Sequence, residues 1–284
     1  MKTLLILMTF ALMTASSVQS QTKNFQSDKL QKVWEASGLI TPESVYPVPA
    51  EKIMYVSNIG SKNPTAKDST GFIAILTFDG KIKNLKWVTG LNAPKGMGIK
   101  DNILYVSDID RVVGIDLKTG KIVASIPVSG SKFLNDIVVD KSGVVYISDS
   151  QTGSVYKIEN GKASTFVHSD DFADPNGLVM YKDKILLGAG DRVVMIDPKT
   201  AKYVDYITNT GVVDGLRITQ PDEILISDWS GKVQLVKKSG EKEVLLDTSK
   251  DEGLNAADLG YVPDSRTIYV PTFFGNSVAC YKLK

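Results

Sequence analysis

The chain repeats one pattern of apolar and polar positions six times. Each copy begins with a turn-like triplet and an apolar step, passes through a loop, and ends in a strand that closes on a small polar residue. The copies are PESVYPVPAEKIMYVSN (42–58), PKGMGIKDNILYVSD (94–108), LNDIVVDKSGVVYISD (134–149), PNGLVMYKDKILLGA (175–189), VDGLRITQPDEILISD (213–228) and AADLGYVPDSRTIYVPT (256–272). The second residues of successive triplets are 52, 40, 41, 38 and 43 positions apart. A strand-rich repeat near 40 residues is typical of propeller blades.

Two further strands follow each of the first five copies and complete a four-stranded unit. The first is rich in β-branched and aromatic residues, as in FIAILTF (72–78) and RVVMIDP (192–198), and turn pairs such as Asp79-Gly80 and Asn160-Gly161 come after it. A second strand then leads into the next copy. We therefore predict an all-β protein, a six-bladed β-propeller with four-stranded blades.

The two ends of the chain predict how the ring closes. The last blade ends at SVACYKL (277–283) with no outer strand after it, and LQKVWEA (30–36) precedes the first copy without a blade of its own. Pairing these segments would complete the sixth blade and remove the exposed sheet edges.

One connection in the first blade is longer than its equivalents. The polar segment NIGSKNPTAKDSTG (58–71) accounts for the spacing of 52 residues. It is either a tolerated surface insertion or a flap over one end of the ring, since long loops on rigid scaffolds often line sites.

Five polar or charged residues share one phase of the repeat. The second positions of the triplets are Glu43, Lys95, Asn135, Asn176 and Asp214, with Ala257 in the sixth place and Asp258 beside it. A propeller turns equivalent positions toward one axis, so these residues should form a ring. The alternative, if each residue is considered by itself, is that the Asn and Asp residues only form turns before the inner strands.

The chemistry of this ring favours a hard cation. Buried carboxylates and amides are costly without partners, and the donors are all oxygens, with no His or Cys. That set suits Ca²⁺ better than Zn²⁺, while Mg²⁺ and Mn²⁺ remain compatible.

The ordered anchors PES, LND, PNG and VDG resemble those of the gluconolactonase family, which includes senescence marker protein and luciferin-regenerating enzyme. The resemblance covers the whole mature chain. It implies a six-bladed propeller with one divalent metal, usually Ca²⁺, on the axis. It also implies that Glu43, Asn176 and Asp214 ligate the metal, and that Asp214 is the general base or nucleophile. Asn135 would contact substrate or supplement the metal shell.

Lys95 departs from what the resemblance implies. A cation at ring level could pair with Asp258 or Asp136, bind an anionic group of the substrate, or stand in for the metal by neutralising the carboxylates. Lys95 therefore joins Asn135 as an expected substrate-binding residue. The first anchor also departs, because many relatives carry Gly after the Glu where this chain has Ser44.

These features lead to two hypotheses of different classes. In the first, the protein is a metal-dependent hydrolase that acts on a small lactone or related ester, with Asp214 as base or nucleophile. In the second, it is a non-catalytic ligand-binding propeller of the cell envelope, similar to NHL-type propellers, with a structural ion or a Lys95 salt-bridge network in the ring. An open pocket favours the first hypothesis over a fully ligated structural ion.

Composition and the N-terminus restrict partners and location. The formal net charge of +1 argues against a nucleic-acid or anionic-membrane partner. Residues 1–20 have the positive start, apolar run and small residues of a secretory signal, which predicts cleavage after Ser20 and a secreted or periplasmic protein. We expect residues 21–284 to form one monomeric propeller domain, with no membrane attachment after the signal is removed.

Several conspicuous residues have ordinary structural explanations. Asp108, Asp149 and Asp228 recur at strand ends, which indicates hairpin-turn hydrogen bonds. The single histidine, His168, is expected in an exposed loop, and Asp170, Asp171 and Asp174 in a solvated one. The remaining assignments are Cys280 as a buried thiol, Trp34 and Trp87 in blade packing, and Trp229 near the pocket.

Overall fold

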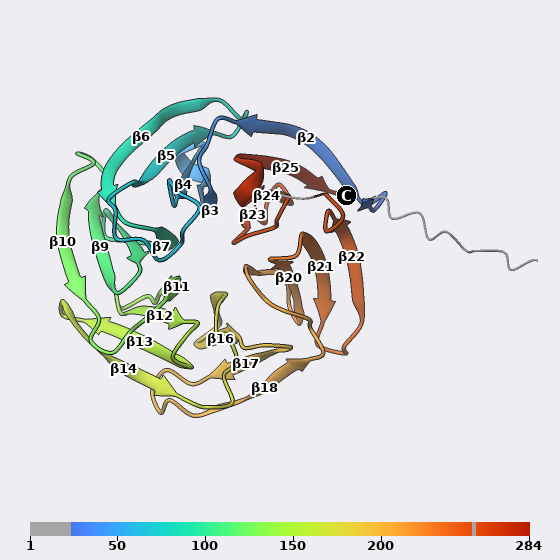
Figure 1. The fold of residues 1–284 in the computed structure, drawn as a ribbon. Coiled ribbons are helices and arrows are strands. Elements are labelled where there is room, and N and C mark those ends of the chain that lie inside the picture. Colours follow the sequence, from blue (N-terminus) through green and yellow to red (C-terminus); the bar gives the residue numbers. More distant parts are fainter. Residues whose placement is uncertain (1–23, 252–253) are drawn as a thin grey trace, which may run out of the picture.

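The computed structural model describes residues 24–251 and 254–284, and these form six four-stranded antiparallel blades in a ring (Figure 1). The predicted six-bladed propeller is confirmed. The predicted signal segment, residues 1–20, lies outside the described residues. In the described part of the chain, no helix is long and apolar enough to cross a membrane.

The first three blades follow the repeat from its first residue, and each inner strand begins at the triplet. Their strands are β3 (Pro42–Val48), β4 (Ile53–Asn58), β5 (Gly71–Thr77) and β6 (Ile82–Leu91); β7 (Pro94–Lys100), β8 (Ile103–Asp108), β9 (Arg111–Asp116) and β10 (Ile122–Pro127); and β11 (Leu134–Val139), β12 (Val145–Asp149), β13 (Ser154–Glu159) and β14 (Lys162–His168).

In the last three blades the triplet lies just before the inner strand. The fourth and fifth blades contain β15 (Leu178–Tyr181), β16 (Lys184–Gly188), β17 (Arg192–Ile196) and β18 (Tyr203–Thr208), and β19 (Leu216–Gln220), β20 (Glu223–Asp228), β21 (Lys232–Lys237) and β22 (Lys242–Asp247). The sixth contains β23 (Gly260–Val262), β24 (Thr267–Pro271) and β25 (Ser277–Leu283). Two 3₁₀ turns, η1 (Pro49–Glu51) and η2 (Phe273–Gly275), complete the elements.

The N-terminal segment closes the ring. Strand β2 (Leu30–Ser37) pairs antiparallel with β25, from Leu30 opposite Leu283 to Ser37 opposite Ser277, as the chain ends predicted (Figure 1). The sequence did not predict that a preceding short strand, β1 (Phe25–Gln26), would add to β22 at the edge of the fifth blade. The N-terminal segment therefore connects two neighbouring blades.

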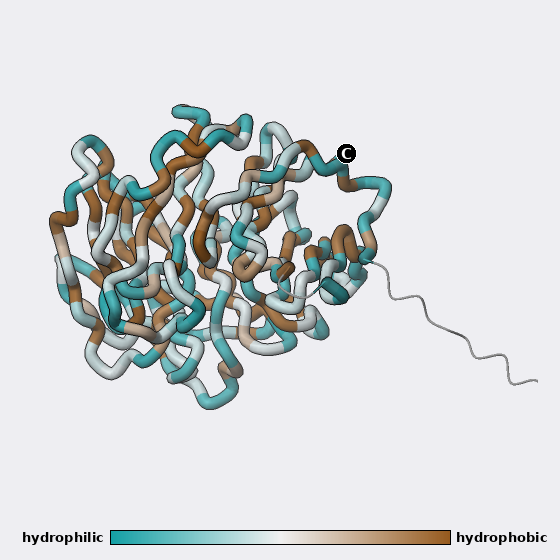
Figure 2. Tube along the Cα trace, turned by 45° about the horizontal axis from the view of Figure 1, so that its top comes forward, coloured by the Kyte–Doolittle hydropathy of each residue, from teal (hydrophilic) through white to brown (hydrophobic). Residues whose placement is uncertain are grey.

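Apolar side chains fill the space within and between the blades. The buried core is dominated by β-branched and leucine residues, mainly from the first three strands of the blades, and hydrophilic segments lie mainly in the connecting loops (Figure 2). Trp34 and Trp87 pack against Tyr269 and Tyr55, which confirms their place in blade packing. Cys280 is a buried free thiol, as predicted.

Candidate functional site

The five predicted ring residues all line one pocket of about 330 Å³. Glu43, Lys95, Asn135 and Asp214 are each no more than 6% exposed. Asn176 completes the set, and Ala257, the sixth member, is buried in an apolar cluster with Ile59 and Phe273. Residues scattered over about 170 positions of sequence thus meet in one cavity, because equivalent positions of a propeller face the same axis.

A local irregularity in the backbone lets consecutive residues of a triplet reach the axial region. In the first three blades the register between the inner strand and its neighbour shifts at the triplet, as it does between Leu134 and Ile137. Such bulges redirect side chains. Asn135 consequently lines the pocket, while the next residue, Asp136, accepts a hydrogen bond from the Leu178 amide of the following blade (2.7 Å).

Glycine allows the inner ends of neighbouring blades to approach closely. A Cβ on Gly96 would lie 2.5 Å from the Asp136 Cα, and a Cβ on Gly177 would lie 2.6 Å from the Asp214 carbonyl oxygen. Both distances are shorter than real Cβ contacts, so any larger residue would push the blades apart.

Glu43 and Asp214 are buried carboxyl groups that strongly disfavour their charged forms. Burial, and then the charges of Asp214 and Asp258, raises the pKa of Glu43 well above its usual range. Burial, and then Asp258 and Asp136, does the same to the pKa of Asp214. Asn176 Nδ2 donates to Asp214 Oδ1 (3.2 Å), which favours the ionised form.

Two oxygens at this site have no hydrogen-bond partner. They are Glu43 Oε2 and the Asn176 side-chain oxygen, both buried. Unpartnered buried oxygens are unusual in proteins and need an explanation such as an ion or water. Together with Asp214 they form an all-oxygen donor set that fits a hard divalent cation such as Ca²⁺. In the described residues no three His, Cys, Asp or Glu side chains gather as a metal cluster, so the amide of Asn176 is needed as a donor.

Lys95 does not pair directly with a carboxylate. Its Nζ donates to the carbonyl oxygens of Pro64 and Ala93, both at 3.2 Å, and lies 4.2 Å from the centre of the Phe133 ring. In the described part of the chain it makes no ion pair within 4.0 Å. The predicted alternatives in which Lys95 pairs with Asp136 or Asp258 are therefore wrong. The charge of Lys95 still acts on the ring, because it opposes the rise in the pKa of Glu43.

Lys95 should make the free energy of unfolding depend on pH. Burial lowers its pKa from 10.5 to about 8, although Glu43 opposes this shift. Between these values the unfolded chain holds a proton that the folded chain has released, so stability due to Lys95 rises with pH. Relative to Lys95→Met, the wild type should gain about 1 kcal/mol or more from about pH 7.5 to about pH 10, because one pKa unit corresponds to about 1.4 kcal/mol. Urea unfolding of both proteins measures this difference, and parallel pH profiles would contradict it.

Arg217, on β19, is the cation that contacts the axial carboxylates. Its Nη2 lies 2.9 Å from Asp258 Oδ1, and its Nη1 lies 3.8 Å from Asp136 Oδ2. Asp258 Oδ2 also accepts from the Ser44 hydroxyl (2.5 Å), which joins the sixth blade to the first. Despite Arg217, burial and the charge of Asp258 raise the pKa of Asp136 to about 8.

Sequence reasoning missed Arg217, although the repeat contains a signal for it. The fifth position of each copy holds, in order, Tyr46, Gly98, Val138, Val179, Arg217 and Gly260. Arg217 is the one charged residue at that phase. A buried charge on the inner strand of a blade requires a partner. Asp136 and Asp258, at the third position of their copies, were the available carboxylates.

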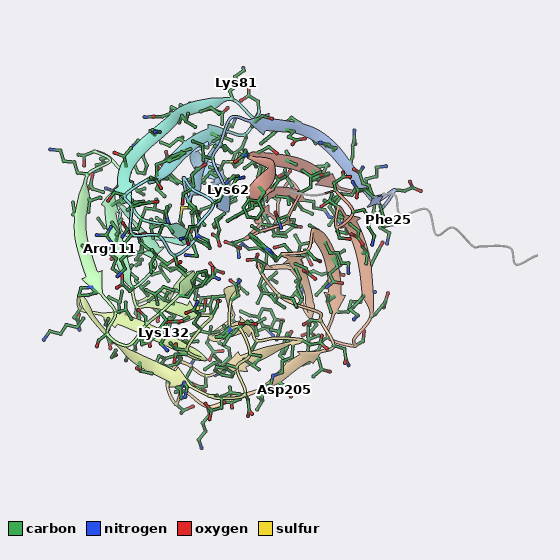
Figure 3. The ribbon with its side chains drawn as sticks, viewed as in Figure 1. Phe25, Lys62, Lys81, Arg111, Lys132 and Asp205 are labelled. Atoms are coloured by element: carbon green, nitrogen blue, oxygen red, sulfur yellow. The ribbon has the colours of Figure 1, made fainter. Side chains whose placement is uncertain are left out.

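The mouth of the pocket is largely aromatic and aliphatic. Trp229, which directly follows β20, contacts Phe273 and Phe274 of η2 with ring centres 4.5 and 6.1 Å apart. All three residues line the pocket, which confirms the expected place of Trp229. The long loop 58–71 also contributes to the site, because Ile59 and Pro64 line the pocket. Lys62 of this loop lies nearer the middle of the ring than Lys81 or Asp205 (Figure 3).

The recurring aspartates and the histidine have structural roles that differ in part from those predicted. Asp108 accepts from the amides of Asn92 and Ala93, and Asp149 accepts from those of Lys132 and Phe133. These two carboxylates therefore hold the segments before β7 and β11, and not only the hairpin turns that follow them. His168 is half exposed and contacts Ser154 but ends strand β14, so the prediction of a loop position is wrong, and it does not line the pocket.

The acidic segment around residue 170 divides between solvent and site. Asp170 is fully exposed, whereas Asp174 lines the pocket. Asp228 accepts from the Ser230 amide in a turn, as predicted.

Comparisons with known proteins identify the fold. No family model matches the chain, and no curated protein matches it. Among solved structures, it is similar to a gluconolactonase from Xanthomonas campestris (TM-score 0.66, 13% identity, covering 90% of this chain and 89% of that one). It is also similar to virginiamycin B lyase from Staphylococcus aureus (0.62, 14%, 90% and 99%) and to a chain of a nidogen/laminin complex (0.61, 13%, 72% and 79%). The TM-scores establish a shared propeller fold, and at these low identities they establish no more than the fold, which enzymes and non-enzymes both use.

Proposed function

We propose that the protein is a hydrolase of a lactone or related ester, and that Glu43, Asn176 and Asp214 hold a divalent cation, with Ca²⁺ as the first candidate. The observation that carries this proposal is the set of unpartnered buried oxygens, Glu43 Oε2 and Asn176 Oδ1, beside the Asp214 carboxyl in an accessible pocket. The resemblance of the ring anchors to gluconolactonases supports it, as does the structural similarity to one such enzyme.

In the proposed reaction, Asp214 is the residue that moves protons. As general base, in the carboxylate form that a bound divalent cation would favour, it takes a proton from water while the water oxygen bonds to the carbonyl carbon. The ester C–O bond then breaks, and the departing oxygen takes the proton from Asp214 to yield a hydroxy acid. The hydrogen bond from Asn176 Nδ2 orients the carboxylate for both transfers. A bound divalent cation supplies charge that polarises the carbonyl and stabilises the developing oxyanion.

Asn135 and Lys95 are suited to hold the substrate. Asn135 Nδ2 donates to Ser150 Oγ (3.1 Å), which keeps the amide at the pocket surface. Lys95 uses two of its three ammonium donors on the carbonyls of Pro64 and Ala93. Its remaining donor is available to an oxygen of the substrate.

Calcium titration is the direct test of the cation site. Chelator-treated protein should bind about one equivalent of Ca²⁺ by calorimetry, because two buried carboxyl groups and an amide oxygen line the same pocket and suit a hard cation. At free Ca²⁺ one hundred times Kd, the free energy of unfolding should rise by about 2.7 kcal/mol. Glu43→Gln should weaken binding at least about tenfold, whereas exposed Asp170→Asn should leave it unchanged.

Two outcomes would count against this proposal. If neither Ca²⁺, Mg²⁺ nor Mn²⁺ binds, the ring oxygens do not form the cation site. If the cation binds but no lactone or ester is hydrolysed across a substrate panel, the ligand-binding propeller becomes the better hypothesis.

A further inference from the structure

The lining of the axial pocket combines two kinds of side chain. Most of its polar side chains belong to the five ring residues. The rest of the lining, called here the apolar wall, is mostly apolar and includes Phe133, Val212, Trp229, Phe273 and Phe274. A ligand in this pocket therefore meets both the hydrogen-bonding groups of the ring and a large apolar surface.

The apolar wall extends to the pocket mouth, where it is open to solvent. Val212, Trp229 and Phe274 are 54%, 40% and 42% exposed. Large apolar side chains that gather in the open beside a pocket are typical of a ligand-binding surface.

Backbone strain at the same place supports this interpretation. Phe273 has a φ of 46°, although its ring is buried against Trp229 and Phe274. Bulky residues rarely adopt this conformation, and such strain persists chiefly where the surroundings hold it, often at ligand sites.

The wall offers few partners to a ligand with many hydroxyl groups. Ser150 is already engaged, since it accepts from Asn135 and donates to the Pro175 carbonyl (3.0 Å). Asp174 is the other polar residue in the lining beyond the ring. Hydroxyls buried against aromatic rings would lose water without compensation, which is unfavourable.

We infer that the pocket accepts a cyclic ester or ester with an apolar or aromatic body, rather than a polyhydroxylated sugar lactone. Trp229, Phe273 and Phe274 are then the residues that determine specificity. The hydrolytic part of this inference rests on the proposed function, whereas the preference for an apolar ligand concerns binding alone.

A matched pair of substrates tests the preference. δ-Decalactone and glucono-δ-lactone share the six-membered lactone ring and differ in whether its substituents are alkyl or hydroxyl. The rate of hydrolysis is measured by the release of protons. The kcat/KM should be at least about tenfold higher for δ-decalactone than for glucono-δ-lactone, because each buried methylene favours binding. Comparable or faster hydrolysis of glucono-δ-lactone would overturn the inference and leave the hydrolase proposal intact.

A binding measurement separates this inference from catalysis. The lactam analogue of δ-decalactone resists hydrolysis and can be titrated by calorimetry. Its affinity should fall at least about fivefold in Phe274→Gln. It should be unchanged in Phe25→Gln, which alters a similarly exposed phenylalanine (48%) at the outer edge of the fifth blade (Figure 3).

The two measurements together distinguish the possible failures. Lactam binding that depends on Phe274, without hydrolysis of either lactone, would support the apolar ligand class and contradict the hydrolase. If the lactam does not bind, or binds equally well to Phe274→Gln, the apolar wall is not the ligand surface and the inference fails.

Discussion

The Asp214→Asn variant should lose about 10³-fold or more in kcat/KM for lactone hydrolysis. The amide that replaces the carboxylate cannot accept a proton from water, and general base catalysis typically contributes a factor of 10² to 10⁴. The variant should still fold, because asparagine has nearly the same shape. Its stability without a cation should be equal to or above that of the wild type, since burial and neighbouring carboxylates disfavour the ionised Asp214.

The measurement combines initial rates with thermal unfolding in chelator. Asp170→Asn makes the same chemical change at a fully exposed position and should leave both quantities unchanged. Retention of most turnover by Asp214→Asn, at wild-type cation occupancy, would show that Asp214 is not the base.

The Arg217→Met variant should have the largest effect on stability. It leaves Asp136 and Asp258 buried without their cation, and breaking a buried ion pair from one side typically costs about 3–5 kcal/mol. The loss should be smaller at about pH 5 than at about pH 8. Without Arg217 the pKa values of both carboxyl groups rise further, so protonation at low pH removes the unpaired charges.

Urea unfolding at both pH values measures this effect. Arg192→Met is the matched control, because Arg192 pairs with the half-exposed Asp205, and such surface pairs contribute about 0–1 kcal/mol. Asp258→Asn added to Arg217→Met should recover part of the loss. If Arg217→Met costs no more than Arg192→Met at about pH 8, the axial ion pairs do not hold the blades together.

The periodic features of the sequence were sufficient to predict the fold. A repeat near 40 residues, four strands in each unit and an unpaired strand at each end led to six blades closed by β2 on β25. The same periodicity predicted that Glu43, Lys95, Asn135, Asn176 and Asp214 would meet. Both results depend only on the phase of a position within its repeat, which a single sequence displays.

Contacts between different phases of the repeat were decided by the tertiary structure. Arg217 of the fifth blade contacts Asp258 of the sixth and Asp136 of the third. Lys95 donates to the carbonyls of Pro64 and Ala93. The addition of β1 to β22 and the positive φ of Phe273 were likewise decided by the tertiary structure and not by the repeat. The physical reason is that the repeat determines which residues face the axis. Side-chain conformations, bulges and loop paths determine which of them touch, and those properties depend on neighbours distant in sequence.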